Sequence, residues 1–155
     1  MGKTLTLARL YGEKDQFARM VKITGDYQGQ LHCTARHEPS GDVLSTDAPK
    51  DNQGKGEAFS PTDLLATAFA TCVCTIVAMA ARTRGVDLAG MDYEVTKEMS
   101  AQPPRRVARL HLRVRLPEEA RAIPLEILER AAHSCPVHQS LSPEIEKLIE
   151  FGWKG

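Results

Sequence analysis

Alternating hydrophobic and polar positions fill the first third of the chain and predict short strands. The four runs with a period of two or a β-rich composition are Thr4–Leu10, Arg19–Thr24, Gln30–Arg36 and Asp42–Thr46. Turn-forming residues separate them at Gly12, Gly25-Asp26, Gly29 and Pro39-Ser40-Gly41. A polar segment, Asp47–Glu57, follows with one proline and two glycines. Its length and composition predict a functional loop rather than a simple connection between two elements.

A nearly unbroken apolar run, Leu64–Ala81, predicts the longest helix of the chain. The start signals are Ser60 as N-cap, Pro61 at the first helical position and Asp63 in the first turn. The end signals are Arg82, Arg84 and Gly85. The 18 residues of the run reach the length of a membrane span, but Ala and Thr make up much of it and weaken insertion. We therefore expect a helix buried on every side within a protein, and no membrane.

Beyond this helix the pattern returns to strands and then to one more helix. The predicted elements are a hairpin of Asp92–Met99 and Arg106–Leu116, a helix at about Pro124–His133 and a last strand at Glu144–Trp153. Strands on either side of one buried helix predict an α+β fold, and the length suits a single domain over residues 1–155. A chain of this size has little surface with which to enclose a helix completely. We therefore expect a homodimer in which a second subunit supplies the missing cover.

Charge and cysteine content narrow the class of protein. The chain has 20 Lys+Arg and 20 Asp+Glu, so it lacks the positive field of a dedicated nucleic-acid binder. Its 4 cysteines are too few for a disulfide scaffold, and the N-terminus lacks the apolar core of a signal peptide. We expect a cytoplasmic protein with reduced thiols.

One strand of the predicted hairpin alternates between apolar and basic residues. Leu110, Leu112, Val114 and Leu116 share one face. The basic stripe consists of Arg105, Arg106, Arg109, His111, Arg113 and Arg115. Such a stripe is usually a solvated strand face, and the alternative is a docking surface for an anionic partner.

The cysteines are the main candidates for chemistry. Cys72-Val73-Cys74 and Cys135-Pro136-Val137-His138 would supply soft metal ligands. However, positions i and i+2 of a helix point about 200° apart, so Cys72 and Cys74 cannot face one ion. We therefore expect no metal. Cys33, in a predicted strand, and Cys74 are expected to serve packing.

Cys72 would need help to become a reactive thiolate. A buried helical cysteine is often an inert small hydrophobe. Cys72 lies nine residues past Asp63, roughly 13 Å along the helix axis, so the helix dipole does not activate it. A nearby cation would have to do so, from the loop before the helix or from another subunit. His133 and His138, on either side of Cys135, either tune its thiol or are neutral surface or capping residues.

Two motifs carry a resemblance to a known family. Phe59-Ser60-Pro61-Thr62-Asp63-Leu64-Leu65-Ala66 leads into Ala70-Thr71-Cys72, and His133-Ser134-Cys135-Pro136-Val137-His138-Gln139-Ser140-Leu141 follows much later. With both motifs in this order, residues 20–153 resemble the OsmC/Ohr family of osmotically inducible and organic-hydroperoxide-resistance proteins.

The resemblance implies a thiol-dependent peroxidase that reduces organic hydroperoxides. Cys72 would be the peroxidatic cysteine and Cys135 the resolving one, and a dithiol such as dihydrolipoamide would reduce their disulfide. No bound cofactor is implied. The implied OsmC-like fold is an intertwined homodimer, in which strands of both chains wrap two buried central helices.

The sequence departs from the family pattern at the groups that assist the thiol. Family members carry Glu directly after the helix-start proline, whereas this chain has Thr62 there and Asp63 one position later. Asp63 would then be a helix cap or an orienting acid, and Glu57 could stand in for it. The candidate cations are Lys50, Lys55 and Arg36. Two hypotheses therefore stay open: the peroxidase, and a non-enzymatic OsmC-like module that binds a ligand or senses oxidant with little turnover.

Overall fold

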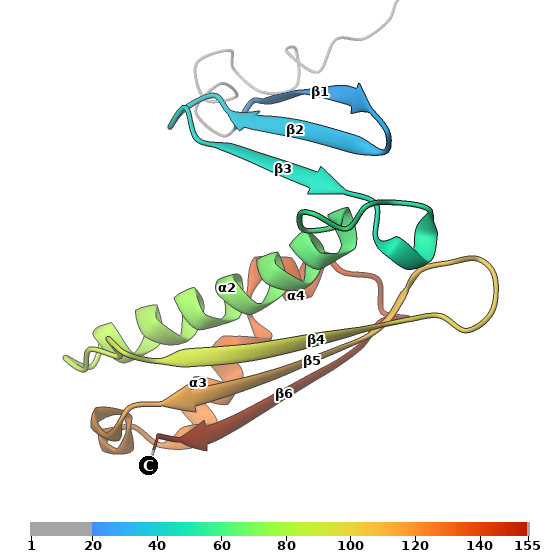
Figure 1. Ribbon diagram of the computed structural model, residues 1–155. Helices are drawn as coiled ribbons and strands as arrows, with labels where there is room; N and C mark the ends of the chain where they lie inside the picture. Colours follow the sequence, from blue (N-terminus) through green and yellow to red (C-terminus); the bar gives the residue numbers. More distant parts are fainter. Residues whose placement is uncertain (1–19, 155) are drawn as a thin grey trace, which may run out of the picture. The chain divides into compact units, whose positions relative to one another are not determined.

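The computed structural model describes residues 20–154, which form two units (Figure 1). The N-terminal unit extends to Ser60 and the C-terminal unit begins at Pro61. The mixture of helices and two small sheets confirms the α+β class. The predicted strand Thr4–Leu10 lies outside the described residues. The single domain expected from the length stays a prediction.

The N-terminal unit is a three-stranded antiparallel sheet in the order β1-β2-β3. Its strands are β1 (Ile23–Gly29), β2 (His32–His37) and β3 (Val43–Asp47). A short 3₁₀ helix, η2 (Lys50–Asn52), lies in the loop after β3. The predicted strands Gln30–Arg36 and Asp42–Thr46 therefore agree with the bounds of β2 and β3 to within two residues.

The first described strand is displaced from its predicted position. Arg19–Thr24 was expected to end at a turn at Gly25-Asp26, but Gly25 lies inside β1 opposite Ala35. A Cβ on Gly25 would lie 2.3 Å from the carbonyl oxygen of Thr34, so this glycine permits close approach of the strands rather than a turn. The turn comes instead at Gly29, Gln30 and Leu31, which have φ angles of 85°, 49° and 62°.

The C-terminal unit places helices against one face of a second sheet (Figure 1). The sheet has the order β4-β5-β6, with β4 and β5 antiparallel and β5 and β6 parallel. Its strands are β4 (Asp92–Met99), β5 (Val107–Leu116) and β6 (Glu146–Trp153), and the helices are α2 (Pro61–Arg82), η3 (Glu118–Ala122), α3 (Leu125–His133) and α4 (Pro136–Ser140). The helix at Pro61, the hairpin and the last strand confirm the sequence-based prediction.

The core of this unit forms where α2 and α3 meet the central strand β5. Leu110, Leu112, Val114 and Leu116 of β5 are fully buried, as their period of two predicts. Phe69, Val73 and Val77 of α2 and Leu128 of α3 are also fully buried. Gly85 terminates the helix just after Arg82, as predicted, with a φ angle of 76°. Its N–H donates to the Arg82 carbonyl, and the N–H of Val86 donates to the Ala81 carbonyl.

Helix α2 is buried along one face only in this chain. Thr71, Thr75 and Met79 are exposed, so the single subunit leaves this face uncovered. Burial on every side, which was expected with a second subunit as cover, stays a prediction. Among residues 20–154, α2 has the length and apolarity of a membrane span. Its Phe69, Val73 and Val77 nevertheless pack in a protein core, as in a core helix.

The basic stripe lies on the opposite face of the sheet and is matched by carboxylates. Arg109 pairs with Glu98 and Glu146 at 3.2 and 2.6 Å. Further pairs are Arg106 with Glu144, Arg113 with Glu94 and Glu150, Arg115 with Asp92, and His111 with Glu150. Neighbouring strands therefore neutralise these cations, which fits the solvated strand face better than a docking surface for an anion.

Candidate active site

Cys72 and Cys135 are neighbours in the folded chain, and the Cys72 thiol is one of the groups that raise the pKa of Cys135. Cys72 lies in the middle of α2 and is half-buried, whereas Cys135 is fully buried. The two residues are 63 positions apart in the chain, and the packing of α3 and α4 against α2 brings them together. Both cysteines are free thiols.

Cys135 occupies the N-cap position of α4. Its Sγ accepts a hydrogen bond from the N–H of His138 at 3.5 Å, and Pro136 follows it at the first helical position. Burial raises the pKa of the Cys135 thiol, the adjacent Cys72 thiol adds to this, and the N–H groups of His138 and Val137 oppose it. Cys135 is therefore protonated at neutral pH. The elements expected from the sequence include no helix at Pro136–Ser140, because the residue before a proline disfavours continuation of the helix that ends at His133.

The ring of His138 connects α4 to both longer helices. Its centroid lies 6.0 Å from that of Phe69 in α2 and 5.3 Å from that of His133 in α3, perpendicular to the latter ring. Burial lowers the pKa of His138, and the nearby His133 and Lys147 lower it further. The ring is therefore neutral at pH 7, which favours the neutral alternative left open by the sequence.

The other two described cysteines have different surroundings. Burial raises the pKa of Cys74 to about 11, and its side chain packs against the core. Cys33 is exposed on β2 opposite Tyr27. Cys74 therefore serves packing and Cys33 is a strand residue, as predicted.

Asp63 is paired with a lysine that the sequence analysis did not single out. The Nζ of Lys97 lies 3.0 Å from the Asp63 carboxylate and donates to the Thr62 hydroxyl at 3.0 Å. Lys97 is mostly buried and shares a face of β4 with Val95 and Met99. A lysine at an apolar-face position of a strand was the available signal, since such a side chain needs a partner. The pair joins the start of α2 to β4.

The remaining predicted site residues belong to the N-terminal unit. Arg36 is exposed on β2 opposite Thr24 and Val43. Lys55 and Glu57 are exposed in the loop after β3, and the Glu57 N–H donates to the carboxylate of Asp47 at 2.8 Å. Their role beside Cys72 stays a prediction.

Asp47 organises this loop and was missed as a structural residue. Its side chain is only 3% exposed and contacts the His32 ring directly across the β2–β3 pair. The His32 ring and the Glu57 N–H hold the pKa of Asp47 below its usual range. A buried, ionised carboxylate with these partners fixes both ends of the loop that carries Lys55.

Replacing Gly54 with Ala is expected to destabilise the N-terminal unit by about 1–3 kcal/mol, as other overpacked sites do. The new Cβ would lie 1.7 Å from the carbonyl oxygen of Ala48, so the loop would have to move. Gly152→Ala is the matched control, because a Cβ there meets nothing within 4 Å. Thermal unfolding of the two variants would measure the difference. Equal melting temperatures would contradict the close approach at Gly54.

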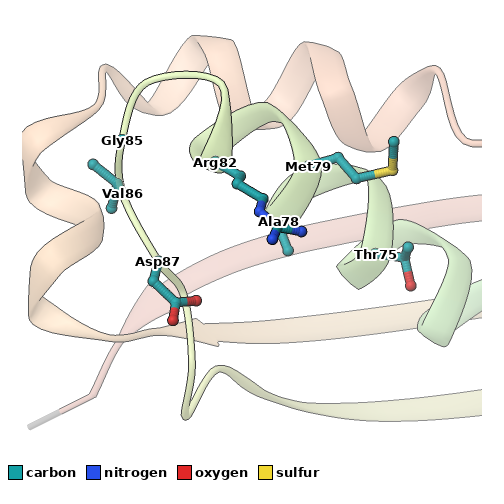
Figure 2. Close-up of a pocket in the computed structure, with 7 residues that line it drawn as sticks. All are labelled: Thr75, Ala78, Met79, Arg82, Gly85, Val86 and Asp87. Atoms are coloured by element: carbon teal, nitrogen blue, oxygen red, sulfur yellow. The ribbon is translucent and has the colours of Figure 1, made fainter.

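A hollow lies at the C-terminal end of α2 (Figure 2). Its lining residues are Thr75, Ala78, Met79, Arg82, Gly85, Val86 and Asp87. Thr75, Met79 and Arg82 belong to the exposed face of the helix. The hollow therefore continues the uncovered side of α2. No three His, Cys, Asp or Glu side chains gather as metal ligands within residues 20–154.

The fold and the site define an α+β protein in which the packing of helices makes two free cysteines, Cys72 and Cys135, neighbours. The family model of OsmC-like proteins matches residues 54–147. The chain therefore belongs to the OsmC-like protein family. No curated protein sequence matches it.

Solved structures agree with this family. A protein from Psychrobacter arcticus, named for osmotic-stress induction and a detoxification response, is 44% identical, with a TM-score of 0.77, 85% of this chain covered and 94% of that one. The OsmC-like protein of Mycoplasma pneumoniae is 16% identical, with a TM-score of 0.71 and coverage of 88% and 99%. An organic hydroperoxide resistance protein OsmC from Legionella pneumophila is 16% identical, with a TM-score of 0.64 and coverage of 86% and 96%. The two lower identities show a shared fold.

Proposed function

We propose that this protein is a thiol-dependent peroxidase that reduces organic hydroperoxides in defence against oxidative stress, with Cys72 as nucleophile and Cys135 as resolving cysteine. The observation that carries the proposal is the packing of α3 and α4 against α2, which brings the Cys135 thiol close enough to Cys72 for Cys72 to raise its pKa. Family membership supports it, as does the name of the Legionella relative, an organic hydroperoxide resistance protein.

The reaction proceeds in two steps at these sulfurs. The Cys72 thiolate attacks the distal oxygen of the hydroperoxide, the O–O bond breaks, and the alcohol leaves with a proton. Cys72 is then a sulfenic acid, oxidised by two electrons. The Cys135 sulfur attacks this sulfenic sulfur, the S–O bond breaks, and the hydroxide leaves as water with the proton released by the Cys135 thiol. The product is a Cys72–Cys135 disulfide, which protects Cys72 from further oxidation.

The catalytic cycle is completed by a reductant that is not part of the protein. A small dithiol such as dihydrolipoamide reduces the disulfide by thiol–disulfide exchange and is itself oxidised to a disulfide. No bound cofactor takes part, and the reducing cytoplasm suits this chemistry.

The groups that activate Cys72 come, in this proposal, from the loop and strands before α2. Arg36 or Lys55 supplies the cation that lowers the pKa of a reactive thiol. Glu57 orients that cation, because Asp63 already pairs with Lys97. The protein acts as an intertwined homodimer, since the exposed face of α2 around Thr75 and Met79 needs cover.

A second candidate is the non-enzymatic module that binds a ligand or senses oxidant with little turnover. The Asp63–Lys97 pair favours it, because the acid nearest the start of α2 then serves the fold. The raised pKa of Cys135 also favours it, because less thiolate is present to resolve a sulfenic acid.

One equivalent of an organic hydroperoxide, added to the reduced protein, distinguishes the two candidates. The expected result is loss of two hydrogens within seconds, with a Cys72–Cys135 crosslink in the peptide map and Cys74 still free as internal control. The measurement is intact-mass and peptide mass spectrometry after thiol blocking. Unmodified Cys72 after minutes would refute the peroxidase and favour the module.

A further inference from the structure

Helix α4 carries the buried Cys135 but has little of its own to hold it in place. It is only five residues long and has no fully buried residue. Helices this short depend on tertiary contacts for stability. The half-buried residues of α4 are Val137, which packs against the core, and His138. The position of the Cys135 sulfur therefore depends on how these two side chains anchor α4.

His138 contacts the longer helices through its ring and the Cys135 sulfur through its main-chain N–H. Its ring lies between Phe69 of α2 and His133 of α3. Its main-chain N–H donates to the Cys135 Sγ at 3.5 Å. In the same region, the side-chain amide of Gln139 donates to the His133 carbonyl at 2.7 Å, which ties α4 to the end of α3. A shift of the His138 ring would therefore move the N–H that holds the sulfur.

The ring can occupy this place because it is uncharged. It contacts the ring of Phe69, and the titratable groups near it are His133 and Lys147, with the Cys135 thiol at the main-chain N–H of the same residue. Burial and the two basic neighbours lower its pKa. In its neutral form the imidazole packs as a flat aromatic ring, which a phenylalanine of similar shape would reproduce.

We propose that His138 is a positioning residue for disulfide formation: its ring, seated against Phe69 and His133, holds α4 so that its N–H keeps the Cys135 sulfur beside Cys72. This inference rests on the proposed function. It concerns only the second step, attack of the Cys135 sulfur on the Cys72 sulfenic acid. Loosening of α4 leaves the first step unchanged and lengthens the life of the sulfenic acid, so more of it is oxidised to sulfinic acid.

The test compares His138→Ala with His138→Phe, both of which keep the main-chain N–H. In His138→Ala, disulfide formation is expected to slow by about tenfold, the scale on which small misplacements of reacting groups act. Formation of the sulfenic acid, trapped with dimedone, stays at the wild-type rate. His138→Phe restores disulfide formation at neutral pH. Rapid-quench mass spectrometry measures both steps and the yield of sulfinic acid.

Acidification provides a second measurement that a merely structural role would not change. Protonation of His138 places a charge against Phe69 and near His133 and Lys147, so the wild-type ratio of disulfide to sulfinic acid falls at low pH. His138→Phe has no such ionisation. Both proteins contain the same two cysteines, so the difference between their pH profiles reports on residue 138. This comparison does not depend on the folding of His138→Ala.

Three results would overturn the inference. These are a wild-type rate of disulfide formation in His138→Ala, equal slowing of both steps in that variant, and a His138→Phe protein as slow as His138→Ala. Absence of any Cys72 sulfenic acid in the wild-type protein is a different result, because it refutes the proposed function itself. Normal disulfide formation in all three proteins refutes only the role of His138.

Discussion

Replacing Cys72 with Ser is expected to abolish hydroperoxide reduction, because a serine hydroxyl is not a thiolate nucleophile at neutral pH. Cys135→Ser has a different expected result: Cys72 reacts once, forms no disulfide and advances to sulfinic acid as more hydroperoxide is added. The fully buried thiol of Cys135 is the neighbour of Cys72, so its loss leaves the sulfenic acid open to a second oxidation. Hydroperoxide consumption with a dithiol reductant, together with the mass of each protein, measures both effects.

Cys74→Ser is the matched control for this pair. Cys74 lies on the same helix two positions from Cys72, and burial raises the pKa of the Cys74 thiol to about 11. Turnover is expected to survive this replacement. An unchanged rate in Cys72→Ser would show that the nucleophile lies elsewhere.

Replacing Leu112 with Ala is expected to lower the free energy of unfolding by about 2–5 kcal/mol, the usual cost of removing a large aliphatic side chain from a core. Leu112 is fully buried at the centre of β5, paired with Val95 on one side and Ile149 on the other. Helices cover its face of the sheet, so the surroundings cannot collapse fully into the cavity. Urea unfolding followed by circular dichroism measures the change.

Leu148→Ala is the control, because Leu148 of the neighbouring strand β6 is 41% exposed. Its replacement removes the same atoms and is expected to cost much less. Equal losses of stability in the two variants would contradict the assignment of the apolar face of β5 to the core.

Much of the fold could be predicted because its signals are local. The hairpin strand Asp92–Met99 has the predicted bounds, and α2 begins at the predicted Pro61. A period of two assigned Leu110 and Leu112 to the core face. The predictions made from prolines and glycines were wrong where the same residue type is compatible with two local structures. Gly25 permits close strand pairing rather than a turn, and Pro136 begins a helix as well as following one.

In the candidate site, too, residues in local motifs were predicted, whereas pairs of residues far apart in sequence were not. The motifs around Cys72 and Cys135 singled out both cysteines through a family resemblance. The Asp63–Lys97 pair and the buried Asp47 beside His32 were missed, because each joins residues far apart in sequence across strands or between a helix and a strand. No local pattern encodes such a partner.

Sequence patterns alone were enough to predict α2, the β4–β5 hairpin, α3 and β6, the buried face of the second sheet, and the two cysteines to be tested. Three further features became visible in the folded chain alone: Cys135 is a neighbour of Cys72, it caps a short helix, and His138 connects that helix to Phe69 and His133. The physical reason is that periodicity and capping act over one or two turns of chain, whereas contact between residues 63 positions apart depends on how α3 and α4 pack against α2.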